Sequence, residues 1–463
     1  MIPKRQFILT KKNLDGDYKE MGEYKLYLGL EEEYILAKSI GIEIHLIGNI
    51  YDWEKPYFSN EDILYNIFWE LFYPSDIIYR FNHYCGEYVV IIRWIGGIYI
   101  FNDAAAQKEI YYDTEFNCFA SQPILIDSEN YQENFYNSQK FIKKSYFILD
   151  ETHRKNVKHL LPNHYIYNNK VKRFYPNKPN LITDSDSAAG KANNMIKGYL
   201  EAMSLRHNIA IAVTGGFDTR ILFLASKDLD CQYYIHQIPE IKNNDIDVRI
   251  ARKLTGIYNK KLDIIPYKIQ DKTQDIDGID FPRYLNPGVG LDKDVVMING
   301  NISEVARNRI GYYRNLSGID LAFLSGYDIE YPATIYSRWL LNKPLFDTLN
   351  YNYLDMLYWE DRMTNWAAKF KTEMAFFGRT VLSPFNSREL LEVLLGTKRS
   401  LRDFYDTKLY KIMISKLCEN KPEIINLSFN PTIKRKFILI AKQLRLFRIF
   451  KYINLKLRIT PEF

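Results

Sequence analysis

The sequence contains few cysteines and no long apolar run. Four cysteines lie far apart among the 463 residues, and this spacing excludes a zinc knuckle, a redox pair and a disulfide scaffold. The longest apolar run, residues 88–101, is interrupted by Arg93 and is too short to span a bilayer. Residues 1–10 carry charge but no apolar stretch of signal-peptide length. We therefore expect a soluble protein of the reducing cytoplasm.

The composition is that of an ordered globular protein, because apolar residues make up 47% of the chain and charged residues 25%. A chain of this length exceeds the usual size of one hydrophobic core, so more than one domain is expected. The formal net charge of +6 is unevenly placed, since residues 431–458 contain nine Lys or Arg and no acid. The basicity is therefore a property of a tail, residues 431–463.

The tail pattern predicts a helix over residues 438–450, with apolar residues at helical spacing and cations between them. Two interpretations stay open for this helix. It docks on an anionic membrane surface or on a carrier-linked substrate, or it packs on the preceding domain with its basic side in solvent. No nucleic-acid partner is expected, because no recognisable binding module accompanies the charge.

Short alternating apolar runs, separated by Gly, Asn and Asp, are frequent in the first part of the chain. Residues 43–47, 88–92 and 97–101 predict strands, and the asparagine pair at 168–169 predicts the turn of a last hairpin. A connector follows this hairpin, so we place a domain boundary near residue 180.

A strand, a glycine pair and a helix start follow one another over residues 208–227. The apolar strand leads directly into Thr-Gly-Gly-Phe-Asp-Thr at residues 214–219, and then into a helical pattern. Glycines let backbone N–H groups approach an anion, and a helix N-terminus adds a favourable dipole. The segment predicts a polyphosphate loop, although the hexapeptide alone also fits an ordinary β–α turn. It is neither a Walker loop nor a dinucleotide fingerprint.

The segments around this loop predict a parallel sheet. Asp184 or Ser185 can cap a helix that runs to about Arg206, a strand is expected over residues 232–236, and a helix over residues 245–254. Alternating strands and helices are typical of such a sheet. Further helices with broad apolar faces are expected over residues 336–340, 354–377 and 388–395.

The Gly-Gly-x-Asp core with hydroxyl residues on both sides resembles the pyrophosphate loop of the ATP pyrophosphatases, and the following Arg220 resembles the asparagine-synthetase-related branch. Residues 247–256, 297–307 and 382–388 are similar to further segments of that family, in the same order. The resemblance covers most of residues 185–425.

This resemblance implies a mixed α/β and α+β architecture. Residues 1–180 are expected to form an N-terminal-nucleophile-like β-sandwich. Residues 181–430 are expected to form a parallel-sheet ATP-pyrophosphatase domain of the adenine nucleotide α-hydrolase-like type, with a helical C-terminal part. Residues 431–463 are the basic helical tail.

The resemblance also implies ATP and Mg²⁺ as ligands. The residues expected to contact ATP and pyrophosphate are Val213, Thr214, Gly215, Gly216, Phe217, Asp218, Thr219 and Gly300. Asp218 is the expected metal ligand, because Mg²⁺ takes one or two carboxylates together with phosphate oxygens.

Glu304 and Lys411 are the expected catalytic residues. Glu304 follows Ile302 and Ser303, which stand where the family's second signature carries glycine and aspartate. A lysine at Lys411, or one turn away at Lys408, would stabilise the charge that develops as an amine attacks an acyl-adenylate.

The N-terminal part resembles the family's class II glutaminase domain in three places, residues 48–51, residues 86–89, and the acidic turn from Asp103 to residue 112. Two chemical groups of that domain are missing. Such glutaminases need a nucleophilic cysteine directly after the initiator Met, where this chain has Ile2. The asparagine that would stabilise the oxyanion is Ile47. We therefore expect the glutaminase fold without glutamine hydrolysis.

The resemblance predicts an AMP-forming carbon–nitrogen ligase that activates a carboxylate as an acyl-adenylate and releases pyrophosphate. The expected substrate is a small-molecule, glycan or peptide carboxylate, and asparagine formation, the family's namesake reaction, stays open. Nitrogen would come from ammonia, from a separate ammonia source or from a substrate amine. The alternative is a catalytically inactive relative that acts as a nucleotide-binding or assembly partner.

Overall fold

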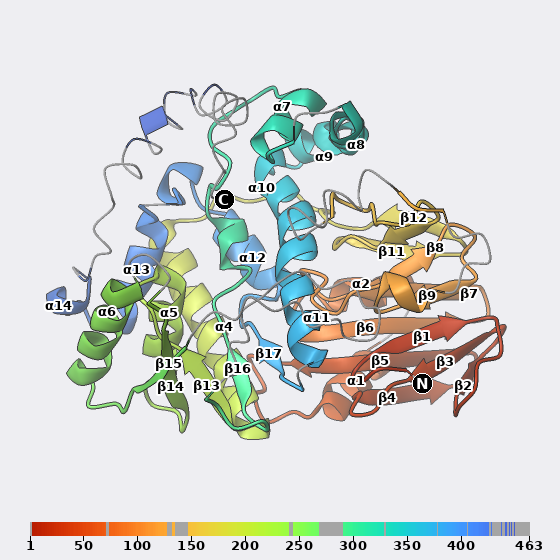
Figure 1. The fold of residues 1–463 in the computed structure, drawn as a ribbon, viewed down its shortest axis with the longest axis horizontal. Coiled ribbons are helices and arrows are strands. Elements are labelled where there is room, and N and C mark those ends of the chain that lie inside the picture. The colour runs from red at the N-terminus through yellow and green to blue at the C-terminus, as the bar shows by residue number, and fades with distance from the viewer. Residues whose placement is uncertain are drawn as a thin grey trace.

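The computed structural model describes residues 2–70, 74–126, 132–134, 147–239, 244–267, 290–327, 330–376, 378–404, 406–425 and 427, with six single positions from 437 onward. In Figure 1 two antiparallel sheets lie on the right and a parallel sheet lies at the lower left. The predicted basic helix over residues 438–450 lies mostly outside the described residues.

The N-terminal half contains two six-stranded antiparallel sheets, with strand orders β10-β8-β9-β1-β3-β2 and β12-β11-β7-β6-β5-β4. The strands of the first sheet are β1 (Phe7–Thr10), β2 (Lys19–Met21), β3 (Tyr24–Leu28), β8 (Tyr111–Asp113), β9 (Cys118–Ala120) and β10 (Val157–His159). The strands of the second are β4 (Tyr34–Ser39), β5 (Ile42–Tyr51), β6 (Cys85–Trp94), β7 (Gly97–Asn102), β11 (His164–Tyr167) and β12 (Lys170–Arg173).

Strand β6 shows how these layers are stacked. Val89 and Ile91 lie in the apolar cluster between the two sheets, whereas Val90 and Ile92 belong to the cluster on the other face. That second cluster includes side chains of α1 (Asn60–Trp69) and α2 (Pro74–Arg80). Successive residues of a strand point to opposite faces, so a strand covered on both sides is apolar throughout. The strands predicted over residues 43–47, 88–92 and 97–101 are confirmed.

The predicted last hairpin is also confirmed, since β11 pairs with β12 in antiparallel register. Its two turn residues, Asn168 and Asn169, have φ angles of 47° and 57°. Two consecutive positive φ values define the turn type that matches the twist of paired strands, and asparagine adopts them at low cost.

The C-terminal half contains a five-stranded parallel sheet with the order β15-β14-β13-β16-β17. Its strands are β13 (Ile209–Ala212), β14 (Gln232–Gln237), β15 (Asp263–Pro266), β16 (Val296–Ile298) and β17 (Val381–Leu382). The helices that accompany it are α4 (Ser185–Arg206), α5 (Phe217–Ser226), α6 (Asn244–Ile257), α12 (Arg388–Leu395), α13 (Lys408–Leu417) and α14 (Pro422–Ile425). The chain leaves β13 toward β14 and β15 and then returns to β16 on the other side, so the order reverses between β13 and β16. The predicted cap, strand and helices of this region are confirmed, with Asp184 as the cap of α4.

One long helix runs between the two halves of the protein in Figure 1. It begins as α10 (Tyr353–Leu357), continues with π-helical hydrogen bonding in η4 (Tyr358–Ala368), and ends as α11 (Lys369–Phe376). A helix over this range is predicted correctly, but its π-helical middle is not. Three shorter helices precede it, α7 (Gly318–Leu324), α8 (Glu330–Trp339) and α9 (Lys343–Thr348).

Buried polar side chains join the two halves. Asn386 donates to an Asp103 carboxylate oxygen at 2.9 Å and accepts from the Ala105 N–H at 2.9 Å. Arg388 is 1% exposed, and it donates to the Asp103 carbonyl at 3.0 Å and to the Asn163 side chain at 3.2 Å. Buried polar groups of this kind are stable only while each keeps its partner, so the halves depend on one another.

Candidate functional site

The two loops that the sequence singles out meet at the carboxyl ends of neighbouring strands. Residues 213–219 follow β13, and Asn299, Gly300 and Asn301 follow β16. In open parallel sheets, ligands bind outside the carboxyl ends of the strands, at the point where the strand order reverses. The order of this sheet reverses between these two strands, so both loops lie at that point.

Hydroxyl groups at each end of the first loop hold it closed. The Thr214 and Thr219 hydroxyl oxygens lie 2.9 Å apart, and the Gly216 N–H donates to Thr214 Oγ1 at 3.1 Å. A Cβ on Gly216 would lie 2.8 Å from an Asp218 carboxylate oxygen, so a larger residue here would displace that carboxylate. Val213 is fully buried at the start of the loop, and Phe217 is half-buried at the first position of α5.

Two charged side chains form hydrogen bonds with the backbone of this loop. Asp247, on α6, accepts the Gly215 N–H at 2.8 Å. Arg220 is 1% exposed and donates to the Gly215 carbonyl at 2.8 Å and to the Ile424 carbonyl at 3.4 Å. Burial lowers the pKa of the Arg220 guanidinium to about 10, so it stays charged at neutral pH. The arginine of the motif therefore positions the loop backbone.

The loop chemistry fits an oxyanion. The N–H of Gly215 already donates to a carboxylate oxygen, and two further N–H groups of the α5 N-terminus, those of Asp218 and Thr219, face the Asp218 carboxylate. Helix N-termini and glycine-rich turns favour negative charge at such positions. A phosphate group could accept hydrogen bonds from these N–H groups if it displaced the carboxylate oxygens that they now contact.

Asp218 lies against Gly300. A Cβ on Gly300 would be 2.4 Å from Asp218 Oδ2 and 2.7 Å from Asp218 Cβ, so only glycine permits this approach. Burial raises the pKa of the Asp218 carboxyl, and the neighbouring charge of Glu304 raises it further, while Arg307 opposes both. The structure therefore brings together three residues that the sequence predicted for one site, Asp218, Gly300 and Glu304.

Two side chains from different elements hold the Glu304 carboxylate. Arg309 donates to its Oε1 at 3.2 Å, and the Tyr358 hydroxyl, on η4, donates to its Oε2 at 3.0 Å. Burial by itself would raise the pKa of Glu304, but the charges of Arg309 and Arg307 outweigh it and the pKa is lowered. An ionised carboxylate of low basicity acts through its charge better than as a proton acceptor.

The turn that carries Glu304 is strained. Ile302 is fully buried and has φ 77° and ψ −30°, in the left-handed region that β-branched residues rarely adopt. Such a residue costs on the order of 1–3 kcal/mol and persists only where its surroundings hold it. Ser303 is fully buried and its hydroxyl has no partner in the described part of the chain. The Ser303 side chain, which stands where the family's signature carries aspartate, therefore lies in the protein interior.

Lys411 is placed differently from the other predicted residues. It lies on α13, which packs against α5, but its ammonium group pairs with Asp406 and both side chains are nearly half exposed. Among the described residues, no contact joins Lys411 to the loop or to Glu304. Lys408 is exposed at the first position of the same helix. The catalytic role predicted for Lys411 stays a prediction.

Within the described ranges, no group of three or more His, Cys, Asp or Glu side chains is arranged to hold a metal ion. A magnesium ion that arrives with a nucleotide needs fewer, since phosphate oxygens complete its coordination. Asp218, at the second position of α5, is the carboxylate nearest to the loop for which this role was predicted, and the role stays a prediction.

The three segments that resemble a glutaminase line one polar pocket together with residues of the C-terminal half, among them His207, Asp294 and Arg379. Asn49, Glu87 and Lys108 come from these segments and face Lys371 of α11 across the pocket. Glu87 pairs with Lys371, and Lys108 binds both carboxylate oxygens of Glu32 at 2.7 Å. These charged lining residues are therefore engaged with one another in ion pairs.

The two positions that lack glutaminase chemistry are occupied by packing residues. Ile47 is fully buried in the cluster between the sheets, and Ile2 packs against a cluster that contains Ile8 and Tyr27. Neither side chain can act as a nucleophile or as a hydrogen-bond donor.

No protein-family model matches the chain, and no curated protein matches it. Among solved structures, the chain is similar to "the allosteric regulatory enzyme of purine biosynthesis", with 9% identity, a TM-score of 0.24, and coverage of 57% of this chain and 74% of that one. It is also similar to glutamine phosphoribosylpyrophosphate amidotransferase from B. subtilis complexed with ADP and GMP. For that structure the identity is 10%, the TM-score is 0.23, and 66% of this chain and 71% of that one are covered. Similarities this low assign neither fold nor function.

Four residues of the site were not predicted as site residues from the sequence, namely Asp247, Arg307, Arg309 and Tyr358. Each acts on a partner at least three positions away through a side-chain contact that no local pattern encodes. The only available signal was that Asp247, Arg307 and Arg309 lie in or beside segments that match the family motifs.

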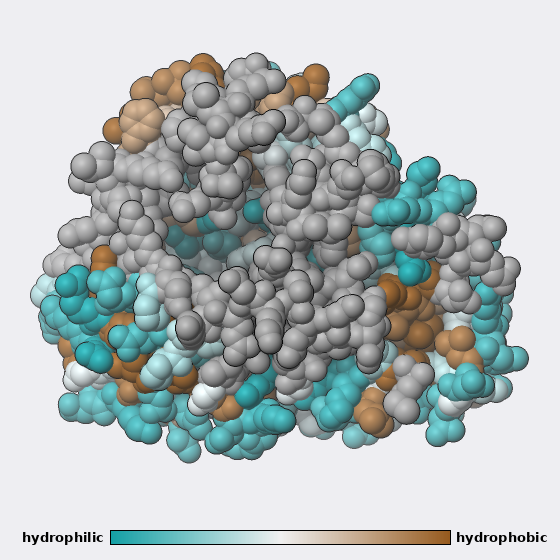
Figure 2. All heavy atoms as spheres, viewed as in Figure 1, coloured by the Kyte–Doolittle hydropathy of each residue, from teal (hydrophilic) through white to brown (hydrophobic). Residues whose placement is uncertain are grey.

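Figure 2 shows hydrophilic side chains on the visible floor of a recess near the middle of this face, and apolar ones at the top margin of the molecule. None of the described helices is both long and apolar enough to cross a bilayer.

Proposed function

We propose that the chain is an ATP-dependent amide-bond-forming ligase of the asparagine synthetase type. The observation that carries the proposal is the approach of Asp218 to Gly300, which brings the two predicted signature loops together where the strand order of a parallel sheet reverses. The polyphosphate motif and a second acidic turn are thus parts of one site.

In this proposal an oxygen of the substrate carboxylate attacks the α-phosphorus of ATP, and pyrophosphate leaves with the bond electrons. The N–H groups of residues 215–219 bind the departing diphosphate. Asp218 would hold Mg²⁺, which would supply positive charge against the phosphate oxygens. A neutral amine then attacks the acyl carbon, AMP leaves with the electrons of the C–O bond, and the nitrogen releases one proton to solvent to give the amide. The ionised Glu304, held in place by Arg309 and Tyr358, stabilises the positive charge that develops on the attacking nitrogen.

The nitrogen source in this proposal is not glutamine hydrolysis by this chain, because Ile2 and Ile47 supply no nucleophile and no oxyanion donor. Free ammonia, ammonia from a separate protein, or an amine of the substrate would serve. Glutamine should therefore fail to replace ammonium ions in the complete reaction.

ATP–pyrophosphate exchange across a panel of carboxylates tests the proposal. Exchange should occur with at least one acid and fall by about 100-fold or more in Asp218→Ala, because a charge-stabilising group is lost. The matched control is Asp228→Ala, an 82% exposed aspartate just beyond the same helix that pairs with its neighbour Lys227. Exchange that survives in Asp218→Ala would overturn the proposal.

One observation favours the alternative of a non-catalytic nucleotide-binding or assembly partner. The Gly215 and Gly216 N–H groups are both engaged within the chain, the first by Asp247 and the second by Thr214. Tight MgATP binding without exchange for any acid, in the wild-type chain, would support this alternative.

A further inference from the structure

Arg307 closes the short turn that carries Glu304, since its N–H donates to the Glu304 carbonyl at 3.0 Å. The residue is 9% exposed, although its side chain carries a charge. Charged side chains are rarely buried to this extent unless a partner compensates the charge. The surroundings of the guanidinium therefore indicate what Arg307 is placed to bind.

Three aromatic rings hold the Arg307 guanidinium in place. Its Cζ atom lies 4.3 Å from the centroid of the Phe404 ring, 5.7 Å from that of Tyr410 and 5.9 Å from that of Phe217. Cation–π contacts are made through the ring faces, so they fix a guanidinium without using its in-plane N–H groups. Two of these rings also belong to the site, because Phe217 begins α5 and the Tyr410 hydroxyl donates to the Ser303 carbonyl at 2.7 Å.

The in-plane donors of Arg307 are only partly satisfied by the protein. Its Nη2 donates to the Phe404 carbonyl, whereas its buried Nε has no partner in the described part of the chain. A buried donor without an acceptor costs free energy, and such groups are rare in folded proteins. The planar fork of a guanidinium matches the oxygens of a carboxylate or a phosphate. The missing partner is therefore expected to be an oxyanion.

The charge of Arg307 acts on both acids of the candidate site. It helps to lower the pKa of Glu304, and it opposes the burial that raises the pKa of Asp218. Glu304 forms its ion pair with Arg309, at 3.2 Å. Among the described residues, no ion pair joins Arg307 to either acid. Arg307 thus lies near both carboxylates while its own charge stays available to a bound anion.

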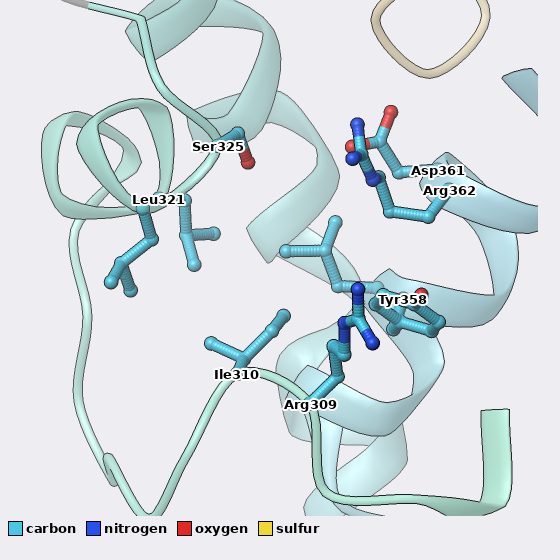
Figure 3. A pocket seen from close by; sticks show the side chains of 9 residues that line it. Arg309, Ile310, Leu321, Ser325, Tyr358, Asp361 and Arg362 are labelled. Carbon is cyan, nitrogen blue, oxygen red and sulfur yellow. The ribbon is translucent and has the colours of Figure 1, made fainter. Parts of the chain in front are cut away.

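The cavity next to Glu304 has no room for a substrate. Figure 3 shows this cavity, which is lined by Arg309 and Tyr358, the two residues that hold the Glu304 carboxylate. Its volume is about 30 Å³, which is the share of one water molecule in the liquid. Asp218 and Arg307, which also act on the charge of Glu304, do not line this cavity. We therefore expect a substrate to reach Glu304 beside these two residues.

We propose that Arg307 binds the α-phosphate of ATP and stabilises the charge that collects there as the substrate carboxylate attacks. This inference rests on the proposed function. The loop of residues 215–219 would hold the two phosphates that leave, so the α-phosphate would lie toward the second turn, which carries Arg307. A carboxylate oxygen forms the new bond to phosphorus, and the departing pyrophosphate keeps the electrons of the bond that breaks. Arg307 gives up no proton in this step, because a guanidinium stays protonated.

The test measures ATP–pyrophosphate exchange in Arg307→Gln and Arg307→Lys. Arg307→Gln should lower kcat by about 100-fold or more, because a charge that faces the reacting phosphate is lost. Arg307→Lys keeps the charge but not the fork, so a loss of about 10-fold is expected. Thermal unfolding of both variants, followed by circular dichroism, corrects for any unfolded fraction.

A second measurement separates contact with the α-phosphate from a structural role. In the two diastereomers of ATP α-thiophosphate, sulfur replaces one or the other non-bridging α-oxygen, and sulfur is a poorer hydrogen-bond acceptor. The wild type should use one diastereomer about 10-fold better than the other or more, because a charge-assisted hydrogen bond is made to only one position. Arg307→Lys should bring this ratio close to one, which a loss of packing alone would not do.

Arg314→Gln is the control variant, since it changes an exposed arginine of the same segment and should alter neither exchange nor the ratio. Wild-type exchange in Arg307→Gln, a loss that only follows the unfolded fraction, or an unchanged ratio in Arg307→Lys would overturn the inference and leave the ligase intact. A change confined to the KM of the acid would overturn it as well, because the bound oxyanion would then be the substrate carboxylate. Failure of every acid in the wild type would overturn the proposed function, and this inference with it.

Discussion

Replacing Gly300 by alanine adds one methyl group at the point where the two loops touch. The new Cβ would lie 2.4 Å from Asp218 Oδ2, 2.7 Å from its Cβ and 2.8 Å from its Cγ. Rotation of the carboxylate can relieve the first contact, but Asp218 Cβ is fixed to the first turn of α5. The backbone of one loop must therefore move, and Asp218 must leave its present position.

The expected cost to folding is modest, about 1–3 kcal/mol, which is typical of an added methyl group in a packed site. The expected cost to catalysis is larger, because a misplacement of about 1 Å in a reacting group lowers rates by about 100-fold. Gly300→Ala should thus unfold at a temperature only a few degrees below wild type, yet lose ATP–pyrophosphate exchange by about 100-fold. Thermal unfolding by circular dichroism and exchange measured on the same samples separate these effects.

Gly190→Ala is the matched control, because nothing lies within 4 Å of a Cβ at this position of α4. It should stabilise the helix by about 0.5–1 kcal/mol and leave exchange unchanged. Wild-type exchange in Gly300→Ala would refute the argument that these loops form one site. A loss of exchange that only tracks the unfolded fraction would refute it as well.

Two more variants test the charges of the protein. Burial alone would lower the pKa of His83, but the carboxylates of Asp52 and Glu389 raise it to about 9. The His83 imidazolium therefore adds up to about 3 kcal/mol to the free energy of unfolding. This contribution is complete below the unfolded pKa of about 6.5 and is lost as the pH rises through 9. His83→Gln should thus make the free energy of unfolding decline less steeply over this pH range. In Glu304→Gln the pKa of Asp218 should fall, because Glu304 helps to raise it, and the acid limb of residual exchange should move to lower pH.

His207→Gln is the control for the first of these variants. Burial lowers the pKa of His207 to about 4, so this imidazole is neutral across the range in question and its loss should not change the slope. Urea unfolding at a series of pH values measures that slope. An acid limb that stays in place in Glu304→Gln would show that the two carboxylates are not coupled.

The features that depend on residues adjacent in the chain could be predicted from the sequence. Helix α12 begins and ends at the residues expected from its apolar spacing, and the asparagine pair of the last hairpin adopts the φ angles that its turn requires. The loop after β13 was located for the same reason, since a strand, two glycines and a helix start are adjacent in the chain. The approach of Asp218 to Gly300 was expected only through the resemblance of both segments to one family.

Pairings between distant side chains could not be predicted in this way. Tyr358 and Glu304 are 54 positions apart, and Asp247 and Gly215 are 32 apart. Each pairing depends on how helices pack on the sheet, and an amphipathic pattern specifies only that a face is buried. Lys411 shows the converse limit, because a motif match located the helix correctly but did not reveal that the ammonium group pairs with Asp406.

The contacts between the halves give the N-terminal half a structural role beside the candidate site. Asn386 and Arg388, in and directly beside the start of α12, direct their buried polar groups to Asp103 of the other half. If Asn163 were replaced by alanine while the halves stay packed, the buried Arg388 guanidinium would lose one of its partners, which is costly for a charge held away from water. The strand that precedes α12, β17, pairs with β16, the strand that ends at Gly300. The N-terminal half therefore stabilises the same sheet edge from which the second loop of the site projects, whether or not it performs any chemistry of its own.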